Sequence, residues 1–230
     1  MALSWTKGHA IMFSEHTITF LRELAQHNNR EWFNANKARY EQHVREPAFA
    51  FIDAMRPRLA RLSPHFVARA SKSGGSLMRV YRDIRFSKNK LPYKTNIGIQ
   101  FRHEAGKDVH APGYYVHIES EQAFVGVGIW HPDTPTLKRI RNYIDAHPTR
   151  WTDARDDERF ARFFHLGGDS LKRAPKGFDP EHPLIEDIRR KDFIAIAPIA
   201  TELIIADDID DIVAGYFEVA TPLMRELCRA

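Results

Sequence analysis

Alternation of apolar and polar residues between Leu77 and Trp130 is the feature that most restricts the fold of this chain. A period of two places successive side chains on opposite faces of a β-strand. The strand-like segments 114–120 and 123–130 are separated by only two residues, which is the spacing of an antiparallel hairpin. A longer loop at 103–113 contains glycine and proline. The stretch therefore predicts an antiparallel β-meander.

Apolar residues on both sides of this stretch recur at helical spacing instead. Ser14 is a suitable N-cap for the first helix, and Pro57 is expected to kink or split the third. One later segment, rich in isoleucine and alanine, is strand-like. The elements expected are helices at about 14–25, 30–44, 47–62, 134–144, 157–165 and 208–227, and a strand at 193–199.

The chain shows no flexible linker and no internal repeat. We therefore predict a single domain over residues 1–230, with a helical part at about 14–63, a sheet-rich part at about 77–130 and a helical remainder. The predicted fold class is α+β, in which an antiparallel β-meander sheet is covered by N-terminal and C-terminal helices.

One face of the predicted sheet is polar and carries little side-chain volume. A two-residue turn pairs His117 with Gly126 and Tyr115 with Gly128, and directly opposed residues share a face. Tyr115, His117 and Glu119 would then stand beside an open, glycine-lined floor, which predicts a pocket. The alternative is that the tyrosines cover the glycines, as aromatic residues do in sheets. Residues of the preceding strand that would join this face are Asn96, Gly98 and Gln100.

The basic excess of the chain is concentrated between Arg79 and Lys94. This segment holds six of the 34 Lys and Arg residues but one of the 30 Asp and Glu residues. The rest of the chain, with 28 cations and 29 acids, is nearly neutral. A local patch of one sign attracts an anionic partner. Three aromatic residues, Tyr81, Phe86 and Tyr93, are interleaved with the cations.

Strand alternation gives Arg82 a different role from the other cations. A regular strand over 78–86 would place Arg82 on an apolar face, where an unpaired charge is very costly. We therefore predict either a bend near Arg82 or a carboxylate partner, with Glu119 and Asp192 as candidates. Lysines on the adjoining loop would remain available to a ligand.

The basic segment also carries a long motif, Arg79-x-x-Arg82-Asp83-x-Arg85-Phe86-x-x-x-Lys90-x-Pro92-Tyr93. This motif resembles the signature of a bacterial and fungal family catalogued as domain of unknown function 2461. Segments 29–33, 113–118 and 172–178 also resemble that family. The resemblance covers nearly the whole chain and implies membership of the family, but it implies no activity.

We expect the basic segment and the polar sheet face to bind an anionic or phosphorylated small ligand. One alternative is a nucleic-acid-binding protein whose cations contact phosphates and whose aromatic residues stack on bases; the near-neutral remainder argues against a large footprint. A further alternative is a structural or interaction protein whose motif is an internal ion-pair network. The residues expected to bind the ligand are Arg82, Arg85, Lys90, Tyr93, Lys94 and Tyr115, and those that could move protons are Asp83 and His117.

No motif in the sequence defines a reaction, so the sequence leaves open whether the protein is an enzyme. Its twelve histidines show no metal-binding spacing, and no phosphate loop or dinucleotide fingerprint is present, so we expect no metal and no cofactor. No apolar run reaches the roughly 18 residues that span a bilayer. With a single cysteine and no apolar signal core at the N-terminus, the expected location is cytoplasmic. The oligomeric state is not determined by the sequence.

Overall fold

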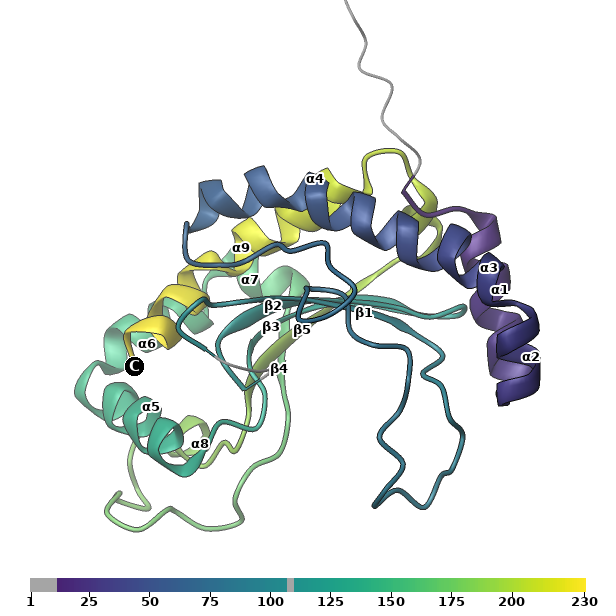
Figure 1. Ribbon diagram of the computed structural model, residues 1–230. Coiled ribbons are helices and arrows are strands. Elements are labelled where there is room, and N and C mark those ends of the chain that lie inside the picture. Colours follow the sequence, from purple (N-terminus) through teal and green to yellow (C-terminus); the bar gives the residue numbers. More distant parts are fainter. Residues whose placement is uncertain (1–11, 107–109) are drawn as a thin grey trace, which may run out of the picture.

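An open antiparallel sheet forms the centre of the molecule (Figure 1). The computed structural model describes residues 12–106 and 110–230. The strand order is β1-β2-β3-β5-β4, so the first three strands form the predicted meander and the last strand of the chain returns beside β3. The strands are β1 (Ile97–Arg102), β2 (Gly113–Ile118), β3 (Ala123–Ile129), β4 (His165–Gly167) and β5 (Phe193–Ile199).

Helices precede and follow the meander in the sequence. Before it come α1 (Glu15–Gln26), α2 (Arg30–Ala35), α3 (Lys37–Tyr40), the π-helical turn η1 (Glu41–Arg45) and α4 (Glu46–Leu62). After β3 come α5 (Thr134–Ala146), α6 (Pro148–Arg155), α7 (Glu158–Phe163), α8 (Ile185–Ile188), the 3-10 turn η2 (Thr201–Ile205) and α9 (Ile209–Arg229).

The hydrophobic core lies between one face of the sheet and the two long helices α4 and α9, which run above the strands in Figure 1. Tyr114 of β2 and Phe101 of β1 point to this side and are at most 1% exposed. The Tyr114 ring lies 4.6 Å from that of Phe217 in α9, and the Phe101 ring lies 6.4 Å from that of Phe51 in α4. Burial of these large apolar side chains favours the α+β arrangement that the sequence predicts, and that prediction is confirmed.

The N-terminal helices differ from the prediction at two points. A single helix is expected over 30–44, but the helix ends at Asn36. The side chain of Asn36 donates to the carbonyl oxygen of Trp32 at 2.9 Å, and such local bonds compete with helix continuation. The predicted split at Pro57 is absent, because α4 is one element from Glu46 to Leu62.

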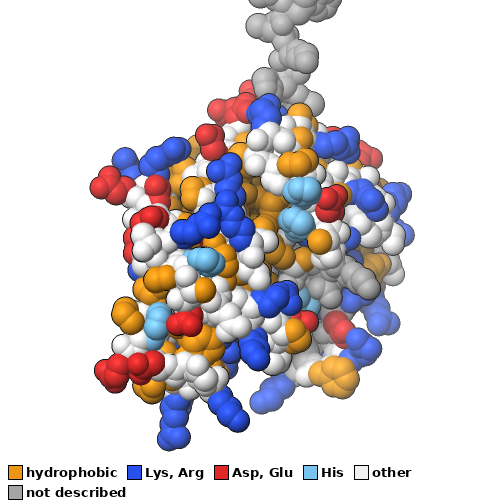
Figure 2. All heavy atoms as spheres, turned by 90° about the vertical axis from the view of Figure 1, so that its left-hand side faces the viewer, with side chains coloured by type: hydrophobic (Ala, Val, Ile, Leu, Met, Phe, Trp, Pro, Cys, Tyr) orange, Lys and Arg blue, Asp and Glu red, His pale blue; other side chains and the backbone are white. Residues whose placement is uncertain are grey.

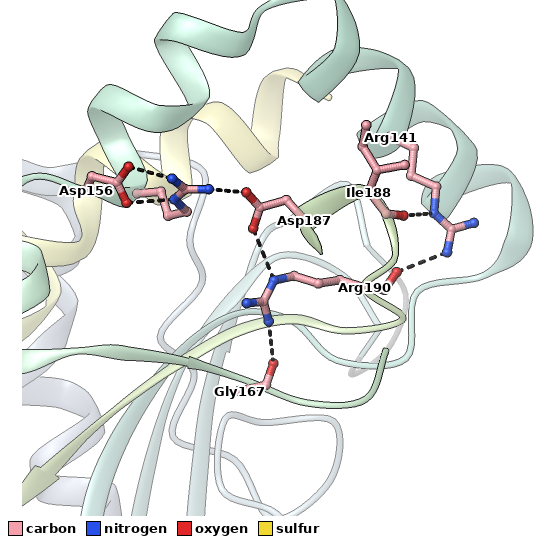
Figure 3. A network of polar contacts seen from close by, with 7 residues as sticks. Arg141, Asp156, Gly167, Asp187, Ile188 and Arg190 are labelled. Carbon is pink, nitrogen blue, oxygen red and sulfur yellow. Dashed lines mark hydrogen bonds and ion pairs between the residues drawn. The ribbon is translucent and has the colours of Figure 1, made fainter. Parts of the chain in front are cut away.

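The segments around β4 and α8 are held by a buried polar network (Figure 3). The carboxylate of Asp187 is 3% exposed and accepts from Arg155 of α6 and from Nε of Arg190 at 3.2 Å. Arg190 also donates to the carbonyl oxygen of Gly167 at 3.2 Å, and Arg141 of α5 donates to that of Arg190 at 3.0 Å. A buried carboxylate needs such partners, so the network fixes these short elements beside β5.

Candidate functional site

The face of the sheet that points away from α4 and α9 carries the polar residues that the sequence predicts there. In the pairing of β1 with β2, Gly98 lies opposite His117 and Gln100 lies opposite Tyr115. Directly opposed residues share a face, so the polar positions of β1 join those of β2. We call this side of the sheet the open face.

The register between β2 and β3 differs from the prediction by two residues. Tyr115 lies opposite Gly126, because residues 119–122 form a longer loop closed by the Glu119 N–H, which donates to the Gln122 carbonyl oxygen at 2.8 Å. A slip of two residues leaves every side chain on its original face. The predicted pairs are therefore wrong, whereas the predicted set of residues on each face is confirmed.

A cavity of about 330 Å³ opens on the open face, where the sequence predicts a pocket. Its floor includes Gly113 of β2 and Gly126 and Gly128 of β3, which expose main chain in place of side chains. The walls are mainly apolar and include Trp130 and Ile194. In Figure 1 two long loops, 79–94 and 168–183, project from the sheet on this same side. The volume is at the lower end of the range for small-molecule sites.

A hydrogen-bonded chain of three side chains from β2 and the loop after it borders this cavity. The Tyr115 hydroxyl lies 3.0 Å from His117 Nδ1, and His117 Nε2 lies 3.0 Å from a carboxylate oxygen of Glu119. The Phe124 ring stacks on the imidazole at 4.5 Å and holds its plane. A carboxylate can only accept, so neutral His117 carries its proton on Nε2 and accepts the Tyr115 hydroxyl at Nδ1.

Tyr115 forms one wall of the cavity as a neutral phenol. Burial, and then the negative charge of Glu119, raise its pKa to about 12. Its hydroxyl covers Gly98, where an added Cβ would lie 2.9 Å from the oxygen, whereas a Cβ added at Gly126 would be 3.7 Å from the nearest atom. Tyr115 therefore covers Gly98 of β1 but leaves room for a side chain at Gly126 of β3. The predicted pocket and the alternative, in which tyrosines cover the glycines, each describe part of the open face.

The basic segment forms a projecting loop, which we call the basic arm (residues 79–94). Its base is closed by a bridge between Tyr81 and Tyr93 and by the Arg82 N–H, which donates to the Pro92 carbonyl oxygen at 2.9 Å. The buried Asn28 donates to the Tyr93 carbonyl oxygen at 3.0 Å and accepts from the Tyr93 N–H at 3.1 Å. The arm contains no continuous strand, so the regular strand that would place Arg82 on an apolar face is not formed. The chain bends at Val80, two residues before Arg82.

Tyr93 belongs to the core and not to the ligand site. Its side chain is 3% exposed, and its ring stacks on that of Phe33 with centroids 4.1 Å apart. This burial corrects the prediction that Tyr93 orients a ligand, since almost none of its surface is accessible. The end of the sequence motif therefore anchors the arm to the helical layer.

Asp83 and Arg85 form the ion pair of the arm. Arg85 donates through Nη2 at 2.7 Å and through Nε at 3.0 Å to the two carboxylate oxygens. These hydrogen bonds lower the pKa of Asp83 to about 2. A carboxylate with so low a pKa is a poor proton acceptor near neutral pH, so the ion pair does not favour the prediction that Asp83 moves protons.

Arg82 does not form the ion pair that the sequence predicts with Glu119 or Asp192. Glu119 binds His117, and Asp192 accepts the backbone N–H groups of His131 and Asp169 at 2.8 and 2.9 Å. Within the described part of the chain, the Arg82 side chain has no acidic partner. Lys90 instead donates to the carbonyl oxygen of Ile84 at 2.9 Å and stiffens the arm.

Lys94, the last residue of the basic arm, lies beside the cavity. Its Nζ is 4.0 Å from the sulfur of Met78, a residue that lines the cavity. Burial, and then the charge of Arg79, lower the pKa of Lys94. Neither Lys94 nor Arg79 forms an ion pair with any residue that the structure describes. The sequence analysis places Lys94 among the ligand-binding residues, but Met78, Trp130 and the β5 wall are additions from the structure.

Two features are absent from the described ranges, 12–106 and 110–230. No three His, Cys, Asp or Glu side chains within them gather as a metal site. No helix there combines the length and the apolarity needed to span a membrane.

The fold and the site thus define an α+β protein with a glycine-floored apolar cavity on an open sheet face and a basic arm beside it. The chain belongs to the family described as conserved hypothetical protein (DUF2461), whose model matches residues 16–225. The family resemblance of the basic motif is thereby confirmed. No curated protein matches the chain.

Proposed function

We propose that the protein binds a small molecule with an apolar body and an anionic group such as a carboxylate or a phosphate. The cavity of the open face would hold the body, and Lys94 with Arg79 would bind the anion. The observation that carries the proposal is the half-buried Lys94, which has no acidic partner among the described residues and lies 4.0 Å from a residue of the cavity wall.

The charges of Lys94 and Arg79 beside the cavity favour binding of an anion. Partial burial removes water from the Lys94 ammonium group, and the neighbouring Arg79 guanidinium repels it, so both lower its pKa. A bound carboxylate or phosphate reverses both effects, because it supplies opposite charge and hydrogen-bond acceptors. The arm cations Arg82 and Arg85 would raise the local anion concentration rather than contact the ligand in the cavity.

Tyr115 and His117 would position a polar group of the ligand. Tyr115 lines the cavity, and the Glu119–His117 pair fixes the orientation of its hydroxyl. With its hydrogen donated to His117, the phenol oxygen can act toward a ligand as an acceptor, and Asn96 shares that oxygen. Binding, and not a defined reaction, is the role that this arrangement supports.

Matched probes separate the two halves of the proposal. We expect calorimetry to show 2-naphthoate binding the wild-type protein at least about ten-fold more tightly than its neutral analogue 2-naphthamide, as for a hydrogen bond to a charged group. Lys94→Gln should remove that difference. Gly126→Val should abolish binding of both probes by filling the cavity, since an added Cβ there has ordinary contacts of 3.7 Å. Lys138→Gln, which removes an exposed cation of α5, is the matched control.

Three outcomes decide the proposal. Equal affinity of the two probes for the wild type would remove the anionic part. Unchanged binding by the Gly126→Val protein would place the probes outside the cavity. If the wild-type protein binds neither probe, the proposed site as a whole is refuted.

Nucleic-acid binding is the second candidate, and one observation favours it. Phe86 on the basic arm is 95% exposed and lies beside the Arg85 guanidinium, an arrangement suited to stacking on an unpaired base. On the side of α5 and α6, Figure 2 shows Lys and Arg side chains mixed with Asp and Glu, which does not favour an extended phosphate track there. Any such contact would be confined to the arm.

Fluorescence anisotropy with labelled oligothymidylate tests this second candidate. If the protein binds nucleic acid, its affinity for the oligonucleotide should fall steeply with salt concentration, because phosphate contacts release counterions. Phe86→Ala should lose about 1–3 kcal/mol of binding free energy, as for one stacked base. Affinity that does not change between low and moderate salt would exclude it.

A cytoplasmic location also belongs to the proposal. It is supported by the single cysteine, Cys228, since proteins of oxidising compartments are commonly stabilised by disulfides. Fractionation of cells that produce the full chain would test it, and recovery outside the cytoplasmic fraction would contradict it.

A further inference from the structure

We propose a second anion-binding subsite on the same sheet face, so that the ligand carries two anionic groups at opposite ends of its apolar body. This inference rests on the proposed function and narrows its ligand class to elongated diacids. The subsite is a cavity of about 280 Å³ whose charged lining residues are Arg69, Arg102 and Glu104. None of these three residues belongs to the basic arm.

The local structure brings the two arginines together. Arg102 ends β1 and has the same parity as Gly98 and Gln100, so it faces the open side. Its carbonyl oxygen accepts the N–H of Val67 at 3.0 Å, which aligns the segment containing Arg69 beside β1. The hydroxyl of the buried Ser76 accepts the Arg69 N–H at 3.0 Å and ties this segment to the next.

Within the described ranges, the two arginines of this cavity have no ion-pair partner. Neither the Arg69 nor the Arg102 guanidinium forms an ion pair or a hydrogen bond with another residue in the described ranges. Among the described residues of the lining, Glu104 is the acid, and it lies 2.6 Å from His65 Nδ1. Two guanidinium groups around one cavity create a positive potential, and their planar donor forks fit the oxygens of a carboxylate or a phosphate.

The site at Lys94 and the site at Arg69 and Arg102 lie beside different residues along β1, and the apolar cavity adjoins both. Gln100 lines both cavities, so they adjoin at this residue. Met78, which contacts Lys94, is level with Gly98, because its N–H donates to the Gly98 carbonyl oxygen at 2.9 Å. At roughly 3.3 Å per residue, the strand from Gly98 to Arg102 spans about 13 Å. A rigid aromatic body with an acid at each end fits this spacing better than a monoacid.

Calorimetry with naphthalene-2,6-dicarboxylate and 2-naphthoate tests the second subsite. We expect the wild-type protein to bind the dicarboxylate at least about ten-fold more tightly, as for one added hydrogen-bonded charge. Arg69→Gln and Arg102→Gln should each reduce this ratio to about one and leave the affinity for 2-naphthoate unchanged. Lys138→Gln should leave the ratio unchanged. Arg69 is exposed, so its substitution tests the subsite with little risk to folding.

The outcomes separate this inference from the function on which it rests. If 2-naphthoate binds but the dicarboxylate binds no more tightly, the second subsite is refuted and the proposed function stands. The same conclusion follows if the ten-fold ratio survives in both arginine variants. If neither compound binds the wild-type protein, the proposed function and this inference fail together.

Discussion

Replacement of Gly128 by alanine should destabilise the protein strongly. Gly128 has a φ of +118°, a conformation that residues with a side chain rarely adopt, and an added Cβ would lie 1.9 Å from the carbonyl oxygen of Phe193 in β5. Backbone strain of about 1–3 kcal/mol and overpacking of about 1–3 kcal/mol together predict a loss of about 2–6 kcal/mol in the free energy of unfolding. For a domain of this size the melting temperature should fall by about 4–24 °C.

Gly126→Ala is the matched control, two residues earlier on the same face of β3. The nearest atoms to an added Cβ there are 3.7 Å away, so the variant should unfold within about 1 kcal/mol of the wild-type protein. Urea and thermal unfolding followed by circular dichroism would measure both. Equal stability of the two variants would refute the reasoning, because it would mean that β3 does not approach β5 as closely at Gly128 as the structure shows.

Three further predictions concern the elements around the site. Asn28→Ala should cost about 1–3 kcal/mol of unfolding free energy by leaving the buried Tyr93 main chain unsatisfied, and hydrogen exchange should quicken at the base of the arm; unchanged exchange would contradict the anchor. Carbon NMR of the Asp83 carboxyl should give a pKa of about 2, which should rise toward the ordinary aspartate value of 3.8 in Arg85→Gln. Because the folded pKa is the lower one, the stability that this ion pair contributes is complete above the pKa of the unfolded chain and is lost as the pH falls through about 2. Asp187→Asn should lower the free energy of unfolding by about 3–5 kcal/mol, and a loss within experimental error would show that the network of Figure 3 is not needed.

Local periodicity was sufficient to predict the layers of this fold. The alternation in β2 assigns Tyr114 to the core and Tyr115 to the open face, and it does so whatever the exact partner strand. The same argument survives the error in the turn, because a slip of two residues preserves parity. The α+β class and the two faces of the meander therefore follow from the sequence alone.

The basic arm could not be predicted in the same way, because its conformation depends on contacts that are distant in the sequence. Tyr93 is buried by Phe33 and held by Asn28, 65 residues away, and nothing in the local pattern marks it as core. The assumption of a regular strand over 78–86 likewise gave Arg82 a buried position and a partner that it does not have. A motif rich in cations thus contains anchoring residues as well as exposed ones.

The walls of the cavity were missed for a related reason. The strand 193–199 is predicted correctly, but its place beside β3 is a pairing between segments that are distant in the sequence. Only that pairing brings Ile194 and Ile196 next to the glycines of β3. The pocket was visible in the sequence as a glycine floor, and its apolar character became visible only with the fifth strand in place.

Backbone NMR of the labelled full chain, titrated with 2-naphthoate, tests the central claim most directly. The structure predicts that the largest amide shifts fall on Gly113, Gly126 and Gly128, which form the floor of the cavity, with smaller ones around Met78 and Lys94. Shifts confined to the exposed part of the basic arm, or spread evenly over the surface cations, would contradict a binding site on the open face.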